Sequence, residues 1–220
     1  MRRSTMQLTI KAVFAVLLSL LVTLSAQAGE DALYAAEAPD GATFIRVVNA
    51  DVSGTIPQAE IGGKAIKDIA PMAASPYIYL PAGTYKLSVG DQAEPVTMEK
   101  NRFYTAVVLD SGELKILADK TFKNPRKALV SFYNLTGDGG VSLKTADGKV
   151  SVIDPLDPIS VGNREINAVK ISLGAFSGGE PVAKTPAVNL QRGKVFSFFV
   201  IDAGGSPQLL VAENRVDTSV

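Results

Sequence analysis

Three residue types with distinctive chemistry are missing from this sequence: cysteine, histidine and tryptophan. Without histidine the chain cannot supply the general base of a Ser-His-Asp triad, a Cys-His dyad or an imidazole ligand for a metal. Without cysteine it has no disulfide, no thiolate nucleophile, no zinc finger and no lipidated N-terminal cysteine. We therefore expect no catalytic residues of these kinds, no metal and no cofactor.

Charge is balanced over the 220 residues but not along them. The sequence has 22 basic and 22 acidic residues, yet its first 28 residues contain three basic residues and no acidic one. The remainder carries 19 basic and 22 acidic residues, a net charge of −3. This weak negative charge does not favour nucleic acid, and we expect no such partner. A hydrophobic content of 46% is ample for a folded core.

The N-terminus has the three parts of a secretory signal peptide. Met1–Lys11 is basic, Ala12–Leu24 is almost wholly apolar, and Ala26-Gln27-Ala28 places small residues just before Gly29. The apolar run is shorter than the roughly 20 residues that a spanning helix needs, so an uncleaved anchor is the weaker alternative. We predict a signal peptide over residues 1–28, cleavage after Ala28 and a periplasmic mature chain.

Beyond residue 41 the hydrophobic pattern is that of β-strands. Apolar segments of four to eight residues alternate with turns rich in Gly, Pro and Asp, without a sustained helical period. This pattern predicts an all-β protein of sandwiches or barrels. The predicted strands are Thr43–Ala50, Tyr77–Leu80, Thr84–Val89, Val96–Met98, Phe103–Leu109, Ala128–Tyr133, Val141–Thr145, Val150–Ile153, Ala168–Phe176, Ala187–Leu190, Val195–Ile201 and Leu209–Ala212.

An internal repeat divides this region. Val96–Asp110 (VTMEKNRFYTAVVLD) aligns without gaps on Val188–Asp202 (VNLQRGKVFSFFVID), and Phe44–Asn49 resembles Leu129–Asn134. The offsets, 92 and 85 residues, suit a duplicated sandwich domain and are too long for a solenoid unit. We therefore predict two tandem immunoglobulin-like β-sandwich domains. Their bounds are residues 29–118 and 128–220, with a basic linker over residues 119–127.

Several polar segments are expected to be turns. In each copy of the repeat, basic residues separate two apolar strands, at Lys100-Asn101-Arg102 and at Arg192-Gly193-Lys194. Surface hairpin turns are the expectation, and a pair of equivalent contact loops is the alternative. Asp138-Gly139-Gly140 and Asp147-Gly148 are also expected to be hairpin turns, and Asp154–Pro158 is expected to be a turn.

The basic linker is a candidate contact surface. Lys120, Lys123, Arg126 and Lys127 are opposed in this segment only by Asp119. On a mildly acidic protein they form a local positive patch, which attracts a polyanion or an acidic partner. The alternative is an ordinary solvated linker between domains.

A second candidate is Gly162–Asn167 (GNREIN), which precedes a predicted strand. We expect a loop that presents Arg164, Glu165 and Asn167, because loops carry function more often than strands do. The alternative is a surface ion pair between Arg164 and Glu165, worth under about 1 kcal/mol.

Several of these motifs, in order, resemble the AlgF family of alginate O-acetylation accessory proteins. The resemblance extends over residues 32–200. Its motifs are Ala32-Leu33-Tyr34, Ala38-Pro39-Asp40-Gly41, Phe44-Ile45-Arg46-Val47, Asn49-Ala50, Phe122-Lys123-Asn124, Lys127-Ala128-Leu129-Val130, Asn134-Leu135, Leu143-Lys144-Thr145-Ala146-Asp147-Gly148-Lys149 and Gly162-x-Arg164-Glu165-Ile166-Asn167-x-Val169-Lys170. Separately, Ser75–Tyr85 resembles a segment of secreted immunoglobulin-like domains, which indicates fold and not activity.

The resemblance implies a periplasmic, non-catalytic adaptor required to acetylate mannuronate hydroxyls of alginate. Its implied partners are a membrane-bound O-acyltransferase and periplasmic alginate acetyltransferases, with alginate itself as a further candidate. The family supplies no catalytic residues to carry over. The residues that we propose for contact with a partner or with the polymer are Lys123, Arg126, Lys127, Lys144, Asp147, Lys149, Arg164, Glu165 and Asn167.

Two other functions remain open at this point. A stand-alone polysaccharide-binding module of the cell envelope would need its tyrosines to replace the missing tryptophan as sugar platforms, yet alternation places several of them in the core. An acetyl-transferring enzyme would need a Ser or Thr nucleophile with a Lys or carboxylate base, and no arrangement in the sequence indicates one.

Overall fold

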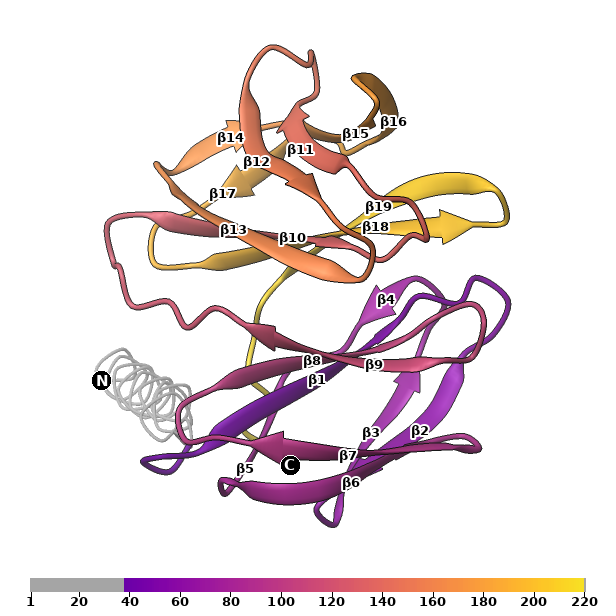
Figure 1. The fold of residues 1–220 in the computed structure, drawn as a ribbon. Helices are drawn as coiled ribbons and strands as arrows, with labels where there is room; N and C mark the ends of the chain where they lie inside the picture. Colours follow the sequence, from indigo (N-terminus) through magenta and orange to yellow (C-terminus); the bar gives the residue numbers. More distant parts are fainter. Residues whose placement is uncertain (1–37, 220) are drawn as a thin grey trace, which may run out of the picture. The chain divides into compact units, whose positions relative to one another are not determined.

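A computed structural model describes residues 38–219, and this part of the chain consists of β-strands and their connections. The predicted signal peptide lies outside the described residues. Among residues 38–219 no helix is long and apolar enough to cross a membrane. The strands form two β-sandwich domains in succession (Figure 1), which confirms the predicted fold class.

The N-terminal domain packs two sheets against each other. One has the order β4-β1-β8-β9, with β5 also paired to β1, and the other has the order β3-β2-β6-β7. Buried Ile45, Val47, Leu87 and Met98 belong to the core of this domain. The strands are β1 Thr43–Asn49, β2 Ile56–Ile61, β3 Lys64–Ile69, β4 Ala73–Ala74, β5 Ile78–Leu80, β6 Gly83–Val89, β7 Gln92–Met98, β8 Phe103–Val108 and β9 Leu114–Asp119.

The C-terminal domain repeats this plan. Its sheets have the orders β13-β10-β18-β19 and β12-β11-β15-β16, and β14 pairs with β17 in a short ribbon. Val130, Phe132, Leu143 and Phe198 lie in the core of this domain. The strands are β10 Ala128–Asn134, β11 Val141–Thr145, β12 Ser151–Leu156, β13 Ser160–Ile166, β14 Val169–Ile171, β15 Leu173–Ser177, β16 Glu180–Lys184, β17 Val188–Leu190, β18 Val195–Ala203 and β19 Ser206–Glu213.

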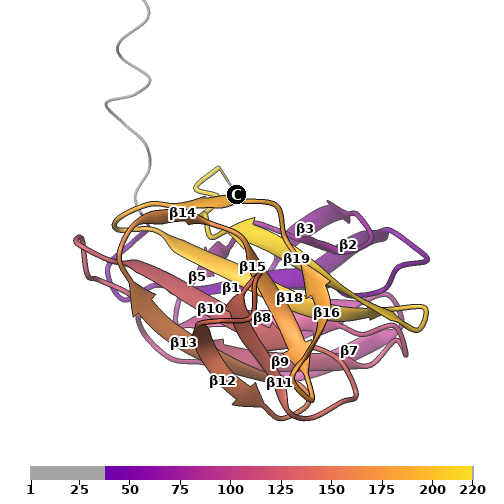
Figure 2. The same cartoon turned by 90° about the horizontal axis from the view of Figure 1, so that it is seen from above.

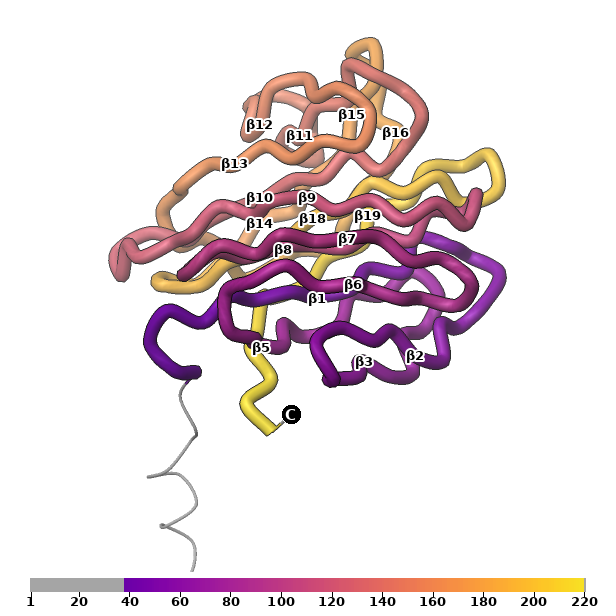
Figure 3. Tube along the Cα trace, turned by 60° about the horizontal axis from the view of Figure 1, so that its bottom comes forward, coloured from indigo at the N-terminus to yellow at the C-terminus, as the bar shows by residue number. Residues whose placement is uncertain are grey.

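The strands β1 and β10 explain how the two domains meet. Every residue of β10 is buried, as is every residue of β1 except Phe44, which is half-buried. One face of each strand lies in the core of its own domain, and the other face meets the opposite domain. The sheets that contain β1 and β10 therefore stack face to face (Figures 1 and 2), and the tube view shows the same succession of layers (Figure 3).

The contact between the domains uses equivalent positions of the repeat. Its buried apolar side chains come from the two central strands of each inner sheet and from the residues just beyond them. They are Val48, Ala50 and Val107 on one side, and Tyr133, Leu135, Phe199 and Ile201 on the other. Val48 aligns with Tyr133, and Val107 aligns with Phe199, so small side chains on one domain receive large ones on the other.

The repeat predicted from the sequence is present at the level of strand register. β1 runs parallel to β8 with Phe44 opposite Phe103, and β10 runs parallel to β18 with Leu129 opposite Val195. These pairs are related by the 85- and 92-residue offsets of the sequence alignment. The turn hydrogen bonds repeat as well, since Asn101 donates its amide to the Ala42 carbonyl (3.0 Å) and Gly193 donates its amide to that of Lys127 (2.7 Å).

The basic turns of the repeat are not hairpin turns, which corrects the sequence expectation. Lys100-Asn101-Arg102 joins β7 to β8, and these two strands belong to different sheets of one sandwich. The left-handed backbone that such a tight turn needs is taken by Asn101 (φ 59°) and by its equivalent Gly193 (φ 72°). Asn is one of the few other residues that tolerate this conformation.

Four other expectations from the sequence are wrong. Asp138-Gly139-Gly140 is not a hairpin turn, because it joins β10 to β11, which belong to different sheets. Gly162–Asn167 is not a loop, because β13 extends through Ile166. The predicted strand Ala168–Phe176 is divided into β14 and β15, which belong to different sheets. Asp154 and Pro155 lie within β12 and not in a turn. Proline is tolerated there because β12 is an edge strand, where a missing N–H breaks no pairing.

Candidate functional site

Four of the residues proposed from the sequence meet at one groove of the C-terminal domain. Lys127 of the linker and Arg164, Glu165 and Asn167 from β13 and its end line a hollow of about 440 Å³. The same hollow, here called the linker groove, is also bordered by residues of β12 and β14. The structure thus joins the two segments that the sequence offered as separate candidates.

The polar side chains of the linker groove are fixed by hydrogen bonds. Lys127 Nζ donates to Asn167 Oδ1 at 2.7 Å. Arg164 Nη1 donates to the backbone carbonyls of Ser151 (2.7 Å) and Val152 (3.2 Å). Glu165 makes no ion pair with Arg164, because neighbouring residues on a strand point to opposite faces. The groove is therefore lined by oriented donors on a rigid strand.

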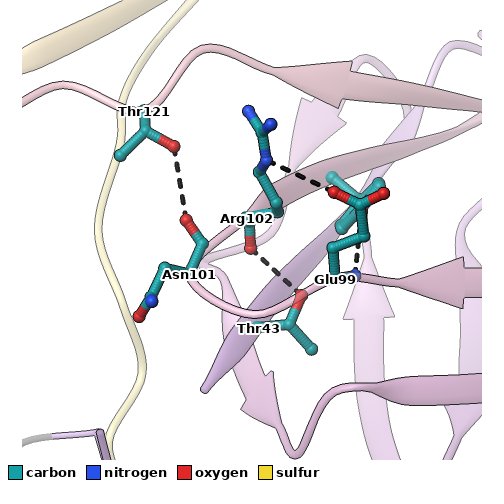
Figure 4. Close-up of polar contacts among 6 residues, drawn as sticks. Thr43, Glu99, Asn101, Arg102 and Thr121 are labelled. Atoms are coloured by element: carbon teal, nitrogen blue, oxygen red, sulfur yellow. Dashed lines mark hydrogen bonds and ion pairs between the residues drawn. The ribbon is translucent and has the colours of Figure 1, made fainter. Parts of the chain in front are cut away.

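The linker itself is held at both ends and in the middle. Thr121 Oγ1 donates to the carbonyl of Asn101 at 3.3 Å, which ties the start of the linker to the first basic turn (Figure 4). Asn124 Nδ2 donates to Glu165 Oε2 at 2.8 Å. The second basic turn holds the end of the linker through Gly193, as described above. This path keeps Lys123 and Arg126 exposed.

The first basic turn is itself braced on the N-terminal domain. Thr43 Oγ1 donates to the Arg102 carbonyl at 3.1 Å, and the Arg102 guanidinium lies 3.6 Å from Glu99 (Figure 4). The Arg102 side chain is exposed, so this ion pair adds little stability. What the turn supplies is a fixed backbone carbonyl for the linker.

The remaining proposed residues, Lys144, Asp147 and Lys149, lie at the connection of β11 and β12. Asp147 accepts hydrogen bonds from Thr145 Oγ1 (2.5 Å) and from the Lys149 amide (3.2 Å), and these two bonds lower the pKa of its carboxyl. Lys144 Nζ lies 5.2 Å from the centre of the Phe176 ring. The structure does not bring these three residues into the linker groove. Asp147 and Lys149 belong to the turn between β11 and β12, and Lys144 lies on β11.

The glycine of the Gly162-x-Arg164 motif has a packing role. A Cβ at Gly162 would lie 2.6 Å from Ile153 Cγ2 and 3.0 Å from Leu156 Cδ2. Residue 162 must therefore lack a side chain if β13 is to pass close to β12. This close approach places Arg164 within reach of the β12 carbonyls.

A buried polar network between the two domains was not foreseen from the sequence. Arg46 of β1 is 1% exposed, and its guanidinium donates to four side chains on both domains. The acceptors are Thr105 Oγ1 (2.9 Å), Asn214 Oδ1 (2.8 Å), Ser197 Oγ (2.8 Å) and Tyr133 Oη (3.1 Å). We call this set with Asp119 and Tyr77 the Arg46 network.

Asp119 supplies the negative charge of the Arg46 network. Its Oδ2 accepts from Thr105 Oγ1 (2.7 Å) and Tyr77 Oη (2.8 Å), and its Oδ1 accepts from Tyr133 Oη (2.7 Å). Thr105 and Tyr133 thus bridge the guanidinium to the carboxylate. Among the described residues every fully buried side-chain nitrogen or oxygen has a hydrogen-bond partner, so the network is complete.

The network perturbs the ionisation of its members. Burial raises the pKa of both Tyr77 and Tyr133, because their phenolates would be desolvated, and the charge of Arg46 only partly offsets this. Burial also opposes the charge of Arg46, but Tyr133, Tyr77 and Asp119 together hold the pKa of Arg46 above its usual value. The guanidinium is therefore a permanent buried cation.

These arrangements do not form a catalytic centre of a known kind. The hydroxyl of Thr105 lies between a carboxylate and a guanidinium, but Thr105 is 0% exposed and no substrate reaches it. Within residues 38–219 no three acidic, histidine or cysteine side chains are placed to hold a metal ion. The chemistry that the accessible groups offer is binding through charge and hydrogen bonds.

The comparisons with known proteins agree on one family. The family model described as "Alginate O-acetyl transferase AlgF" matches residues 15–197. The alginate biosynthesis protein AlgF of Pseudomonas aeruginosa is 40% identical over 185 residues, which is 84% of each chain. Its namesake from Pseudomonas fluorescens is 37% identical over 198 residues, 90% of each chain. That of Azotobacter vinelandii is 39% identical over 173 residues, 79% of this chain and 78% of the relative.

Two solved structures are also similar to parts of this chain. The C-terminal domain of AlgF from Pseudomonas aeruginosa is 40% identical and covers 40% of this chain and 99% of its own, with a TM-score of 0.37. The N-terminal domain from that protein is 30% identical and covers 38% of this chain and 100% of its own, with a TM-score of 0.34. With a family model over most of its length and relatives near 40% identity, this chain belongs to the AlgF family of alginate biosynthesis proteins.

Proposed function

We propose that this chain is a periplasmic, non-catalytic adaptor in the O-acetylation of alginate at mannuronate residues. It would bridge a membrane-bound O-acyltransferase and periplasmic alginate acetyltransferases by protein–protein contacts. The family places the chain in alginate biosynthesis. The finer role is inferred from the chemistry of the described residues and from the predicted signal peptide.

The main observation in support of the adaptor role is that the linker exposes unpaired charges on a backbone that is held in place. The side chains of Lys123 and Arg126 are exposed and make no hydrogen bond or ion pair with another residue in the described part of the chain. Three linker residues are anchored by hydrogen bonds, so the segment is not a free solvated tether. The anchored backbone of the linker loses little conformational entropy on binding, and its two unpaired cations attract an acidic partner surface.

Two observations support a non-catalytic role, although the family description names a transferase. The sequence has no histidine, so it cannot supply the usual base of an acyl-transfer triad. Thr105, one of several described residues whose hydroxyl donates to a carboxylate, is fully buried between the two domains. The chemistry of transfer is then left to partner enzymes.

The alternative of a stand-alone polysaccharide-binding module finds little support. Sugar platforms use exposed aromatic faces. Tyr77, Tyr104 and Tyr133 are buried, Tyr85 is half-buried against the core of the N-terminal domain, and Tyr79 faces the ammonium of Lys64 at 4.0 Å. The described tyrosines therefore do not form an open aromatic surface.

The first test is the O-acetyl content of alginate from cells that lack this chain, with a complemented control. Loss of acetyl groups with normal polymer yield supports the role in acetylation, and unchanged acetylation contradicts it. Lys123→Glu/Arg126→Glu should lower acetylation in complemented cells while the purified variant keeps its thermal midpoint. The control Lys86→Glu/Lys184→Glu changes the charge equally at exposed residues of β6 and β16, away from the linker, and should acetylate normally.

A further inference from the structure

A cavity lies where the two domains, the linker and the C-terminal tail come together. It has a volume of about 260 Å³. Its walls include Phe103 of the N-terminal domain, Phe122 of the linker, Lys194 of the second basic turn and Val216 of the tail. None of these segments forms the cavity alone, and it is separate from the linker groove. We call it the junction cavity.

The tail completes the junction cavity by crossing from one domain to the other. Asn214 donates its amide to the Val195 carbonyl (2.9 Å) in the C-terminal domain. Beyond Asn214, the Tyr77 amide of the N-terminal domain donates to the Arg215 carbonyl (2.8 Å), and the Tyr77 carbonyl accepts from the Asp217 amide (2.7 Å). Figure 1 shows this last, yellow segment leaving β19 and running along the N-terminal sandwich. The wall that it adds is held in place by backbone hydrogen bonds.

The rim of the junction cavity is cationic. Lys120, Lys194 and Arg215 surround it, and all three are exposed. Lys194 and Arg215 share one carboxylate, Glu213, at 3.6 Å each. Lys120 makes no ion pair or side-chain hydrogen bond with a described residue. The three cations of the rim and the one carboxylate of Glu213 thus leave two positive charges without a counter-charge.

The interior offers aromatic and polar surface. The Phe103 ring stacks on Phe44 at 4.3 Å and meets Tyr77 edge-on at 5.2 Å, so its position is fixed. Asp119 also borders the cavity, but both its oxygens already accept hydrogen bonds within the Arg46 network. An apolar side chain with an adjacent anion matches this surface better than a cation does.

The size of the junction cavity limits its occupant. A volume of 260 Å³ corresponds to about eight or nine water molecules at roughly 30 Å³ each. This space accommodates one or two side chains of a peptide. The cationic linker residues Lys123 and Arg126 follow Lys120 in sequence, and both are exposed.

We propose that the junction cavity is the docking site for an acidic peptide segment of a protein partner. A glutamate or aspartate carboxylate of the peptide is held by Lys120 and Lys194, and a neighbouring apolar side chain packs between Phe103 and Phe122. This assignment rests on the adaptor role proposed above and specifies where and by what chemistry the partner binds. Because the site needs both domains and the tail, a partner binds only the fully docked chain.

The test uses two peptides and the purified chain from residue 29 onward, labelled with nitrogen-15. The probe is acetyl-Phe-Glu-Glu-amide, and acetyl-Phe-Gln-Gln-amide is its uncharged match. In amide NMR titrations the acidic peptide should shift Gly193, Lys194 and Val195 and the tail amides. The uncharged peptide should bind at least severalfold more weakly, because exposed ion pairs contribute modestly but additively.

Variants test whether the cations of the rim are responsible for binding the acidic peptide. Lys120→Gln/Lys194→Gln should weaken the acidic peptide about tenfold, and the control Lys86→Gln/Lys170→Gln should bind it normally. If the double variant is poorly folded, Lys120→Gln alone, at a residue with no side-chain partner, should still weaken binding by severalfold. Equal binding of the two peptides, shifts that centre elsewhere, or equal loss in the control would overturn the proposal. The titration needs no alginate, so its failure is distinct from a failure of the acetylation test.

Discussion

Replacement of Arg46 by methionine should destabilise the whole chain, because this side chain is the buried cation between the two domains. Methionine keeps much of the length and apolar volume but removes four hydrogen bonds, two of them to the C-terminal domain and one to the tail. It also removes the buried positive charge to which Thr105 and Tyr133 link the Asp119 carboxylate. Loss of one partner of a buried charge pair costs about 3–5 kcal/mol.

This loss in free energy of unfolding is large enough to measure by heat. For a chain of this size about 1 kcal/mol lowers the thermal midpoint by about 2–4 °C, so Arg46→Met should lower it by about 6–20 °C. Each domain has its own core. We therefore expect the single transition of the parent chain to separate into two in the variant, followed by calorimetry and near-ultraviolet circular dichroism.

Two controls make the reasoning refutable. Arg164→Met removes an exposed guanidinium bound only to two carbonyls and should cost about 1 kcal/mol or less. Asp119→Asn should cost less in the Arg46→Met background than in the parent chain, because the lone carboxylate is the source of the penalty. If Arg46→Met changes stability by no more than Arg164→Met, or if the two changes are additive, the Arg46 network does not couple the domains as described.

Three further predictions follow from the same contacts. Since burial raises the pKa of Tyr77 and Tyr133, the folded chain keeps both protons while the unfolded chain releases them near pH 10. The free energy of unfolding should therefore be full below about pH 10 and fall above it by up to about 1.4 kcal/mol per pH unit for each tyrosine. A thermal midpoint that stays constant from pH 9 to 11.5 would contradict this. Gly162→Ala should cost about 1–3 kcal/mol in urea denaturation, because its Cβ would overlap Ile153, whereas Gly54→Ala meets no atom within 4 Å and should be nearly neutral. Asn214→Ala should cost about 1–3 kcal/mol by leaving Arg46 Nη1 and the Ser197 hydroxyl without an acceptor, and faster protease cleavage of the tail would report its release.

The alternation of apolar residues in the sequence predicted most of the strands, and the internal repeat predicted the two domains. The strands β2 and β3 were not predicted from the sequence, because proline, lysine and the Gly62-Gly63 turn interrupt a short pattern of buried residues. The strand β13 was not predicted because its Gly, Asn, Arg and Glu residues are typical of loops. Its burial is only partial along an outer strand of the sheet, so the apolar signal is weak.

The linker groove was predictable in part, and the Arg46 network was not. Lys127, Arg164 and Asn167 could be proposed from charge and motif, although only the pairing of β10 with β13 brings them together. Arg46 interrupts an apolar strand, which is a signal, but its acceptors lie 59, 87, 151 and 168 residues away. No local pattern links residues over such distances.

The stacking of two like sheets also has a consequence for how this interface could vary over evolution. In a symmetric dimer of identical chains every substitution appears on both sides of the axis at once, so a residue must be compatible with its own copy. Here the two copies are covalently joined, and equivalent positions hold different residues: Arg46 aligns with Ser131, and Val48 aligns with Tyr133. A guanidinium at both 46 and 131 would place two like charges in the same buried interface between the sheets. Tethering removes that constraint and makes the association independent of concentration.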